Sequence, residues 1–293
     1  MQKNAFIAIV GRPNVGKSSL LNAFLGQKVA IVSEKPQTTR TRITGVLTKN
    51  ELQMVFIDTP GLHKPRTVLG ERMNRAVGDG MADVDGCLLV VEAGSPVSKA
   101  DENLIGRMKA RKIPAVLAIN KIDLVAKEKL LSQILELSGR FNFAAIVPVS
   151  AKEGDGVDEL LQELEAFAAE GPHFFDGDTL TDQPERVLAA EYIREQLLRR
   201  LNQEVPHGIA VAVEAFRERN DGLLDMEAII YCEKESHKGI VIGKRGEMLK
   251  KVGSGARAEM EAFFGCRVNL QLWVKVKEDW RNRQGLIHHF GLD

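Results

Sequence analysis

The sequence is poor in cysteine, has no excess of charge of either sign and contains no long apolar run. Its 3 cysteines, Cys87, Cys232 and Cys266, are far apart and odd in number. This spacing argues against a disulfide framework and against a zinc site. Each cysteine lies in an apolar or strand-like stretch, so we expect the thiols to pack in the core of a protein from a reducing compartment.

Long apolar runs and net charge exclude further classes of protein. No stretch approaches the roughly 18 residues that cross a membrane. The start, MQKNAFIAIV, leads directly into a glycine-rich loop, which indicates a buried strand and not a signal peptide. We therefore expect a cytoplasmic protein. With 40 basic and 40 acidic residues the net charge is zero, so only a local count of charge can indicate a nucleic-acid partner.

The first part of the chain alternates strand-like and helical patterns. Continuous apolar runs over residues 6–10, 54–57, 86–91, 115–119 and 145–149 predict strands buried on both faces, hence a parallel sheet. Residues 43–49 alternate and predict an antiparallel edge strand, while residues 157–168 predict a helix. The fold expected here is α/β, a doubly wound and mostly parallel sheet.

A length of 293 residues suggests two domains. The Gly-, Pro- and Asp-rich stretch at 171–184 reads as a linker, so we predict a first domain over 1–172, a linker over 173–184 and a second domain over 185–293. The second domain is expected to be α+β. Its expected elements are a helix at 185–204, strands at 209–216 and 226–233, a helix at 247–264 and a strand at 268–276.

The segment GRPNVGKS at residues 11–18 fits the G-x-x-x-x-G-K-[ST] pattern of a phosphate-binding loop. It lies between an expected strand and an expected helix, a context that a chance glycine-rich turn would lack. Lys17 would reach the β- and γ-phosphates of a nucleotide, and Ser18 would bind Mg²⁺. The predicted nucleotide-binding residues here are Gly11, Asn14, Val15, Gly16, Lys17, Ser18 and Ser19.

Two later segments predict that the base is guanine. In NKID at residues 120–123, the carboxylate of Asp123 can accept two hydrogen bonds from guanine, whereas adenine would leave polar groups unpaired. Asn120 would tie the loops together and Lys121 would lie along the base. The SAK segment, Ser150, Ala151 and Lys152, follows the next strand and offers a backbone amide to the guanine oxygen. GTP and GDP are therefore the expected ligands.

Two segments between these motifs are expected to respond to the γ-phosphate. In DTPG, Asp58 would hold Mg²⁺ through water and the amide of Gly61 would sense the γ-phosphate. Upstream, Thr39 is our choice for a magnesium and γ-phosphate contact, with Thr38 as the alternative. Leu62 follows Gly61, where many GTPases place a glutamine that orients the attacking water. Leucine cannot do this.

A second glycine-rich loop, GKRG at residues 243–246, joins two helical segments and is not followed by Ser or Thr, so it is not a second nucleotide site. It resembles the GxxG loop of a KH domain, which clamps about four nucleotides of single-stranded RNA. The expected order of helix, two strands, helix, GxxG loop, helix and strand resembles the type II KH arrangement. Residues 234–283 carry 12 Lys and Arg against 6 Asp and Glu, an excess of six positive charges. The predicted RNA-binding residues are Lys238, Ile242, Gly243, Lys244, Arg245, Gly246, Lys250 and Lys251. Trp273 is expected to pack under a helix, with base stacking as the alternative.

Together, these motifs resemble the translation-factor-like branch of the GTPases. DTPGLHKPRTVLGERMN, the PQTTRTR segment and the KH-like part resemble the Era family in particular. The resemblance implies a Mg²⁺-dependent GTPase of small-subunit ribosome assembly. It implies a monomer that binds the 3′ end region of 16S ribosomal RNA and the 30S subunit, not DNA, with an occasional peripheral location at the inner face of the membrane. Asn14 is similar to residues of GTPases that use K⁺ in place of an arginine finger, the alternative being an asparagine that stabilises the loop.

The same motifs are compatible with three other functions. The first is a nucleotide-gated RNA-binding scaffold whose hydrolysis is incidental, which Leu62 keeps open. The second is a metabolic P-loop kinase, which would not explain NKID. The third is a GTPase of tRNA modification, which shares the PQTTR and Asn14 features but gives no reason for a KH-like unit.

Overall fold

The computed structural model describes residues 1–62, 65–202 and 205–292, and its contacts divide the chain into two compact units. The first comprises Met1–Ala30, Thr39–Lys64 and Met73–Asp182. The second comprises Ile31–Thr38, Pro65–Arg72 and Gln183–Asp293. Two short segments from the first half of the chain therefore have most of their contacts in the second unit. The predicted domain boundaries at residues 172 and 184 remain a prediction.

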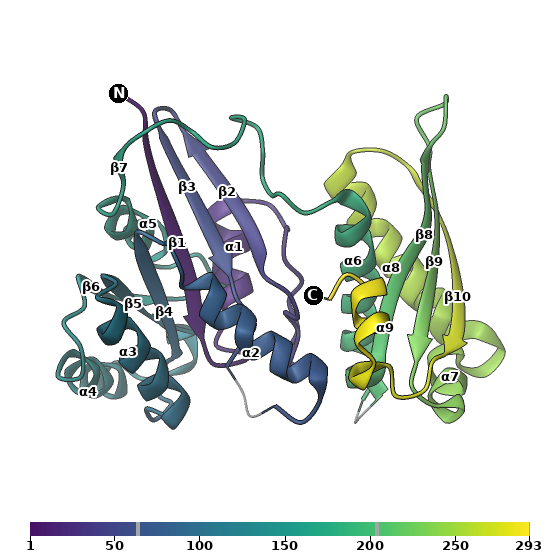
Figure 1. Ribbon diagram of the computed structural model, residues 1–293, viewed down its shortest axis with the longest axis horizontal. Helices are drawn as coiled ribbons and strands as arrows, with labels where there is room; N and C mark the ends of the chain where they lie inside the picture. Colours follow the sequence, from purple (N-terminus) through teal and green to yellow (C-terminus); the bar gives the residue numbers. More distant parts are fainter. Residues whose placement is uncertain (63–64, 203–204, 293) are drawn as a thin grey trace. The chain divides into compact units, whose positions relative to one another are not determined.

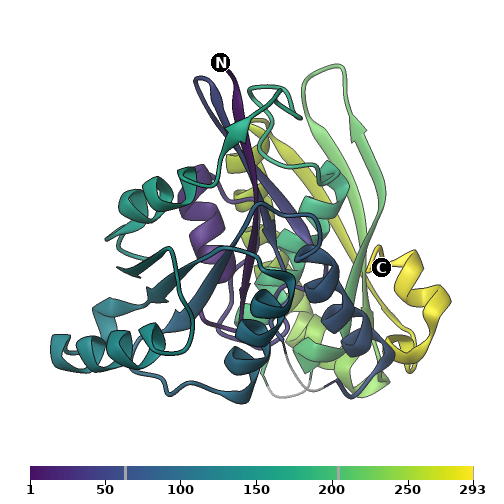
Figure 2. The ribbon, with the colours of Figure 1, turned by 60° about the vertical axis from the view of Figure 1, so that its left-hand side comes forward.

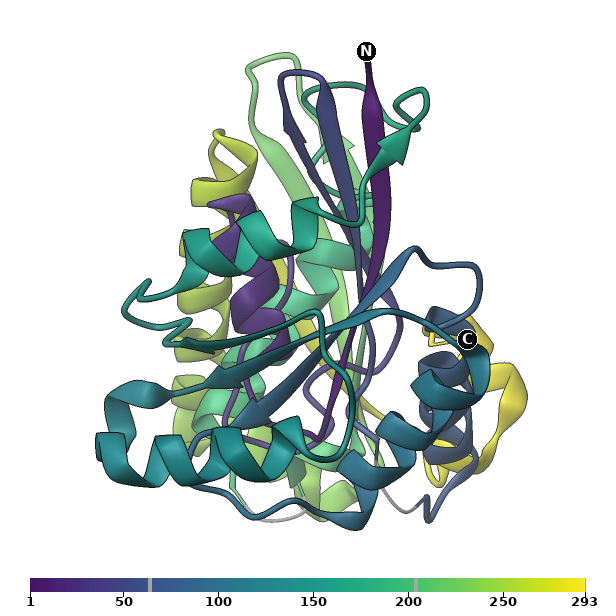
Figure 3. The ribbon, with the colours of Figure 1, turned by 90° about the vertical axis from the view of Figure 1, so that its left-hand side faces the viewer.

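The first unit is an α/β sandwich around one sheet, as expected. The sheet order is β2-β3-β1-β4-β5-β6, with β7 paired to β1 beside this path. The pairs β2 with β3 and β1 with β7 are antiparallel, and the other described pairs are parallel. Figures 2 and 3 show α1 and α5 on one side of the strands and α3 on the other. The elements are β1 (Lys3–Gly11), α1 (Lys17–Leu25), β2 (Ile43–Lys49), β3 (Leu52–Asp58), α2 (Val68–Gly80), β4 (Gly86–Glu92), α3 (Lys99–Arg111), β5 (Ala115–Asn120), η1 (Ile122–Leu124), α4 (Lys127–Ser138), β6 (Ala145–Val149), α5 (Val157–Glu165) and β7 (Ala169–Glu170).

The apolar runs form the central strands because both of their faces are covered. Side chains of β1, β4 and β5 pack with α2, α3 and α4 in one apolar cluster, and Cys87 lies in it. The predicted antiparallel edge strand is confirmed as β2. The predicted helix over residues 157–168 ends early, at Glu165, and the short strand β7 that follows pairs with β1. The sequence pattern missed β7 because two exposed residues carry no periodicity.

The sheet places the nucleotide motifs at one edge. In the parallel register Ile9 pairs with Asp58, and Asn120 pairs with Val149. The carboxyl ends of β1, β3, β5 and β6 therefore lie along the same rim, and each leads into one of the predicted loops. Ligands of open α/β sheets bind at this rim.

The second unit has one three-stranded sheet, in the order β10-β9-β8, covered by helices. Figure 1 shows α6 and α8 side by side on one face of this sheet, and both contact it. Strands β9 and β10 are parallel, β8 and β9 antiparallel. The elements are α6 (Glu185–Arg200), η2 (Val205–Gly208), β8 (Ile209–Glu218), β9 (Leu224–Cys232), α7 (Glu235–Ile242), η3 (Lys244–Gly246), α8 (Glu247–Phe264), β10 (Val268–Val276), η4 (Trp280–Asn282) and α9 (Gln284–His289).

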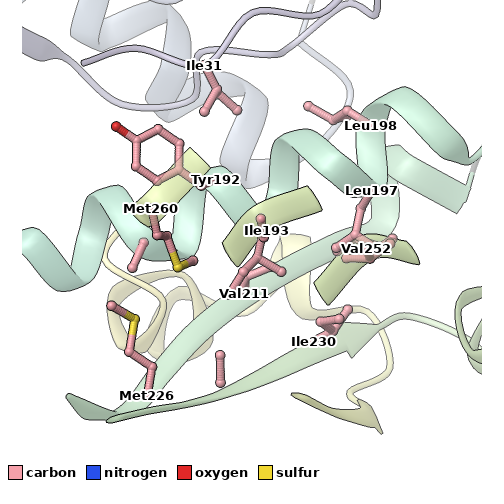
Figure 4. Close-up of a cluster of buried hydrophobic side chains, with 14 of the residues drawn as sticks. Ile31, Tyr192, Ile193, Leu197, Leu198, Val211, Met226, Ile230, Val252 and Met260 are labelled. Atoms are coloured by element: carbon pink, nitrogen blue, oxygen red, sulfur yellow. The ribbon is translucent and has the colours of Figure 1, made fainter. Parts of the chain in front are cut away.

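The core of this unit lies between α6 and the sheet. Figure 4 shows Ile193 and Leu197 of α6 close to Val211, Ile230 and Val252. The predicted helix over 185–204 begins where expected and ends at Arg200; residues 203–204 lie outside the described part. The predicted order of helix, two strands, helix, GxxG loop, helix and strand is confirmed.

The expected linker is tied to the first sheet. The side chain of Gln53 donates to the carbonyl of Phe175 at 2.9 Å, and the amide of Val46 donates to the carbonyl of Leu180 at 2.8 Å. Thr181 also donates to the carbonyl of Thr44 at 2.6 Å. The segment up to Asp182 thus belongs by its contacts to the first unit. No helix in the described ranges is both long and apolar enough to cross a membrane.

Candidate nucleotide and RNA sites

The phosphate loop connects β1 to α1, and its lysine, Lys17, is buried. Gly16 caps α1 with a left-handed backbone (φ 100°), so the first amides of α1 face the loop. The side chain of Lys17 is 5% exposed. Its Nζ donates to the carbonyls of Gly11 at 3.3 Å and Arg12 at 3.0 Å. Burial lowers the pKa of Lys17, while the charge of Asp58 opposes that shift.

A cluster of three oxygen-bearing side chains lies next to this lysine: Asp58 and Thr39 are buried and Ser18 is half-buried. The hydroxyl of Ser18 donates to Oδ2 of Asp58 at 2.6 Å and lies 2.9 Å from Oγ1 of Thr39. Asp58 is fully buried, and its burial raises the pKa to about 6 against the opposing effects of Lys17, Ser18 and Thr39. The hydroxyl of Thr38 donates elsewhere, to the carbonyl of Lys35 at 2.6 Å, so Thr39 is the threonine at this cluster.

The cluster fits a magnesium ion. Oδ1 of Asp58 is buried and has no hydrogen-bond partner within residues 1–62, 65–202 and 205–292. A buried carboxylate oxygen without a partner is costly unless a cation or water meets it. Two hydroxyls and a carboxylate are also the hard oxygen ligands that Mg²⁺ prefers.

The DTPG loop approaches the phosphate loop so closely that only glycine fits at its end. A Cβ on Gly61 would lie 2.4 Å from the backbone nitrogen of Pro13 and 2.6 Å from its Cα. Both obstacles are backbone atoms, which cannot turn aside. Leu62, the next residue, packs against the apolar cluster of α2, α3 and α4. Its side chain is therefore a packing group.

The two base-recognition segments are joined to the phosphate loop by one asparagine. Nδ2 of Asn120 donates to the carbonyl of Val15 at 2.8 Å, and its Oδ1 accepts from the amide of Ala151 at 3.0 Å. The hydroxyl of Ser150 donates to Oδ1 of Asp123 at 2.7 Å. Asp123 is exposed, so its other oxygen can meet a ligand.

The remaining predicted nucleotide residues are distributed around this frame. Asn14 adopts a left-handed backbone (φ 65°), which asparagine tolerates better than most residues. Val15 is buried and Ser19 is half-buried in the first turn of α1. Lys121 pairs with Glu92 at 3.2 Å and Lys152 with Glu153 at 2.8 Å.

The GKRG loop of the second unit has a backbone that is left-handed at Arg245 (φ 52°) and Gly246 (φ 80°). Gly243, at φ 72° and ψ 174°, ends α7 in a conformation open in practice to glycine alone. A Cβ there would lie 2.7 Å from Cβ of Met248. The loop thus brings bare backbone to the surface ahead of α8.

A groove of about 370 Å³ runs from this loop along α8 to β10. Gly246 and Lys250 are the predicted RNA-binding residues that line it. Arg257, one of the basic residues that the sequence places near the loop, also lines it. The other lining residues are Leu249, Gly253, Ser254, Leu270 and Leu272, which the sequence did not single out. Positions 246, 249, 250, 253, 254 and 257 follow the spacing of one helix face, and this periodicity would have found them.

The other predicted RNA-binding residues lie beside the groove. Lys244 and Arg245 are exposed at the loop and Ile242 is half-buried behind it. Lys238 pairs with Glu235 at 3.3 Å, while Lys251 is exposed but does not line the groove. Trp273 is 43% exposed, so the expectation that it packs under a helix is wrong. It lies on the face of β10 away from Leu270 and Leu272, with Gln271 and Lys275.

Comparison with protein families gives two matches. The model of a family described as 50S ribosome-binding GTPase matches residues 6–121. The model of the KH domain matches residues 204–281. The first match contains the phosphate loop and DTPG, and the second contains the GKRG loop and its groove.

Relatives and solved structures match over nearly the whole chain. GTPase Era of Ruminiclostridium cellulolyticum is 52% identical over 289 residues, covering 99% of this chain and 97% of its own. GTPase Era of Clostridioides difficile is 48% identical, covering 99% of both. An Aquifex aeolicus Era variant bound to GDP and AlF4⁻ superposes with a TM-score of 0.95 at 38% identity, covering 99% of both chains. An Era in complex with MgGDPNP and nucleotides 1506–1542 of 16S ribosomal RNA has a TM-score of 0.93 at 38% identity, covering 100% of this chain and 99% of that one.

Proposed function

The chain belongs to the Era family of GTPases, and on this premise we propose that it is a GTP-controlled RNA-binding switch in assembly of the 30S ribosomal subunit. Its RNA would be the 3′ end region of 16S ribosomal RNA. The observation that carries the proposal is that one chain holds both the Ser18–Thr39–Asp58 cluster and a glycine-flanked groove with basic residues. The complex of a relative with 16S ribosomal RNA nucleotides supports the choice of RNA.

The nucleotide site supports binding and orientation of GTP. The amides at the start of α1 and the ammonium of Lys17 would hold the phosphates. Ser18, Thr39 and Asp58 would hold Mg²⁺, which, when bound, neutralises charge that develops on the phosphate oxygens. In this reaction water attacks the γ-phosphorus, the bond from that phosphorus to the bridging oxygen breaks, and GDP and phosphate leave.

Guanine selectivity is proposed for Asp123, with Asn120 and Ser150 as positioning residues. Ser150 fixes one carboxylate oxygen of Asp123, and Asn120 fixes the SAK loop through the amide of Ala151. A base that cannot donate to Asp123 would leave its carboxylate unpaired.

The side chain at position 62 does not orient water, because Leu62 packs into the apolar cluster. We therefore expect slow hydrolysis in the absence of a partner, about 10⁻⁴ to 10⁻² s⁻¹. The proposed compensating charge is a K⁺ ion held at Asn14, whose left-handed backbone turns the loop at that point. Replacing K⁺ by Na⁺ should slow hydrolysis; equal rates in the two salts would remove the ion from the proposal.

RNA contact is proposed for the groove and loop together. Glycines at 243 and 246 let backbone approach the sugar–phosphate chain, and Lys250 and Arg257 would contact phosphates. The apolar floor of Leu270 and Leu272 suits the faces of unstacked bases. We also predict that the protein is a monomer that binds RNA and not DNA. Two further predictions are a cytoplasmic location and a linker over residues 173–184.

The alternative is an RNA-binding scaffold with incidental hydrolysis, and Leu62 is the observation that favours it. The experiment that separates the two is steady-state GTP hydrolysis with no RNA, with an oligonucleotide matching the 3′ end of 16S ribosomal RNA, and with a scrambled oligonucleotide. The switch predicts faster hydrolysis with the matched RNA alone. Equal rates in all three would support the scaffold.

A further inference from the structure

Residues 31–38 lie just before Thr39 in the chain, and their contacts place them with the second unit. Ile31 is 2% exposed and belongs to the apolar cluster of α6. Figure 4 shows Ile31 near Tyr192 of α6, on the side of the helix away from Val211 and Ile230. Helix α6 is therefore covered on two sides, by the sheet and by this segment.

Three consecutive polar residues of α6 are buried: Arg194 at 2%, Glu195 at 0% and Gln196 at 3% exposure. In most helices at least one of three consecutive polar side chains is exposed to solvent, because burying a charged group is costly unless it is paired. Gln196 is used within the unit, since it donates to Glu259 at 2.7 Å. The other two residues reach the 31–38 segment.

Glu195 and Arg194 hold opposite ends of this segment through its backbone. A carboxylate oxygen of Glu195 accepts from the amide of Val32 at 2.8 Å, and the same oxygen accepts from Arg199 at 3.0 Å. The guanidinium of Arg194 donates to the carbonyl of Thr38 and is itself paired with Glu191, from which its Nε lies 2.7 Å. Both hydrogen bonds are made to backbone groups of the segment. They therefore depend on the backbone conformation of residues 32–38 and not on the side chains there.

The carbonyl of Thr38 belongs to the same peptide group as the amide of Thr39. Fixing that carbonyl therefore fixes the peptide plane from which Thr39 extends, and Thr39 lies 2.9 Å from Ser18 in the magnesium cluster. If Thr39 moved away from Ser18, this peptide would have to turn and the contact with Arg194 would change. Nη1 of Arg194 is buried with no hydrogen-bond partner among the described residues, so this side chain is held in place at a cost in free energy.

We propose that Arg194 and Glu195, on the first helix of the RNA-binding unit, are positioning residues for the GTP-bound arrangement of residues 32–39. They stabilise the backbone conformation of residues 32–39 that brings Thr39 to the magnesium cluster. When Thr39 leaves the cluster, these contacts are lost. This role rests on the proposed function in one respect, namely that GTP and GDP favour different backbone conformations of residues 32–39. In addition, it assigns to α6 the contacts that respond to this change.

The test compares affinities for GDP and for a non-hydrolysable GTP analogue, both with Mg²⁺, by fluorescence of labelled nucleotides on the full chain. Arg194→Ala should weaken analogue binding about tenfold, because a charge-assisted hydrogen bond is lost, and should change GDP binding less than about twofold. Arg194→Lys should recover part of the loss. Glu195→Gln, which keeps one acceptor, should show a smaller effect of the same kind.

Arg200→Ala is the matched control. Arg200 lies on the same helix and carries the same charge, and its hydrogen bonds go to the carbonyl and the side chain of Gln196, so in the described chain none of them reaches Glu195 or the 31–38 segment. Its ratio of analogue to GDP affinity should equal that of the wild type. Equal loss of both nucleotides in Arg194→Ala, or the same selective loss in Arg200→Ala, would overturn the inference.

Failure of the proposed switch has a different signature. If Arg194→Ala selectively loses the analogue while RNA affinity is the same with either nucleotide, the positioning role stands and the RNA switch fails. If RNA affinity depends on the nucleotide but Arg194→Ala binds both nucleotides as the wild type does, the positioning role alone fails. Circular dichroism and the midpoint of thermal unfolding, measured on each variant, identify one that does not fold, and Arg194→Lys then carries the test.

Discussion

At the scale of single residues, the buried carboxylate of Asp58 destabilises the folded protein when it is ionised. Burial raises its pKa from 3.8 to about 6, so the folded protein binds a proton more tightly than the unfolded chain. The stability from this group is fully present below the unfolded-state pKa of 3.8 and is lost as pH rises through about 6. At neutral pH the cost is on the order of 2–3 kcal/mol.

The first prediction follows from that sign. In protein freed of nucleotide and Mg²⁺, Asp58→Asn should gain stability over the wild type by about 1 kcal/mol between pH 5 and pH 8. Urea unfolding at several pH values measures this difference. If the free energies of unfolding of the two proteins changed with pH in the same way, Asp58 would not be the group that destabilises the wild type.

Gly61 gives the second prediction. In Gly61→Ala the new Cβ would meet the backbone of Pro13 at 2.4 Å, so the DTPG loop must withdraw from the phosphate loop. Because overpacking of this kind costs about 1–3 kcal/mol, binding of a GTP analogue should weaken at least about fivefold, and GDP binding should change little. Gly177→Ala is the control, since a Cβ there meets nothing within 4 Å. Equal analogue affinity in both variants would contradict this reading of the loop.

At the scale of elements, the long apolar runs were the informative signal. The central strands could be predicted because strands buried on both faces are short continuous apolar runs, and α8 because an amphipathic helix has a clear period. A helix was predicted at 185–204, with Ile193 and Leu197 on its apolar face, but Arg194, Glu195 and Gln196 of α6 are buried as well. Their polar character predicts exposure to solvent, whereas the residues that cover them come from a distant part of the sequence. A local sequence pattern cannot predict such long-range contacts.

The groove on α8 shows the same limit in a milder form. The GKRG loop could be identified as a motif from the sequence, whereas Gly253 and Ser254 became binding candidates only once the structure showed the helix face on which they lie. Gly255, the next residue, faces α6: a Cβ there would lie 2.3 Å from Oε1 of Gln196. The small residues of this helix thus serve both close helix packing and the groove.

The third prediction concerns Arg257 as a phosphate contact in the groove. Arg257→Gln should weaken RNA binding several-fold, without dependence on RNA sequence, and should reduce the slope of log affinity against log salt by about 1. Electrophoretic or fluorescence titrations at three salt concentrations give both values. Lys129→Gln, an exposed position on α4 in the first unit, removes the same charge and should leave the slope unchanged. An unchanged slope in Arg257→Gln would remove it from the interface.

At the scale of the whole molecule, two sites with different chemistry share one chain. One is a rim of a parallel sheet with a buried carboxylate and two hydroxyls, and the other is a groove beside a glycine-flanked basic loop. If they are coupled, thermodynamic linkage requires that GTP raise RNA affinity by the same factor by which RNA raises GTP affinity. Typical coupling of 1–3 kcal/mol corresponds to about 5- to 150-fold.

The most direct measurement is the affinity of a labelled oligonucleotide matching the 3′ end of 16S ribosomal RNA, with a non-hydrolysable GTP analogue and then with GDP. A scrambled oligonucleotide and the double variant Gly243→Asp, Gly246→Asp serve as controls. The account predicts tighter binding of the matched RNA with the analogue, by at least about fivefold, and loss of that binding in the double variant. Equal affinity in the two nucleotide states would contradict it, leaving a GTPase and an RNA-binding domain that share a chain without coupling.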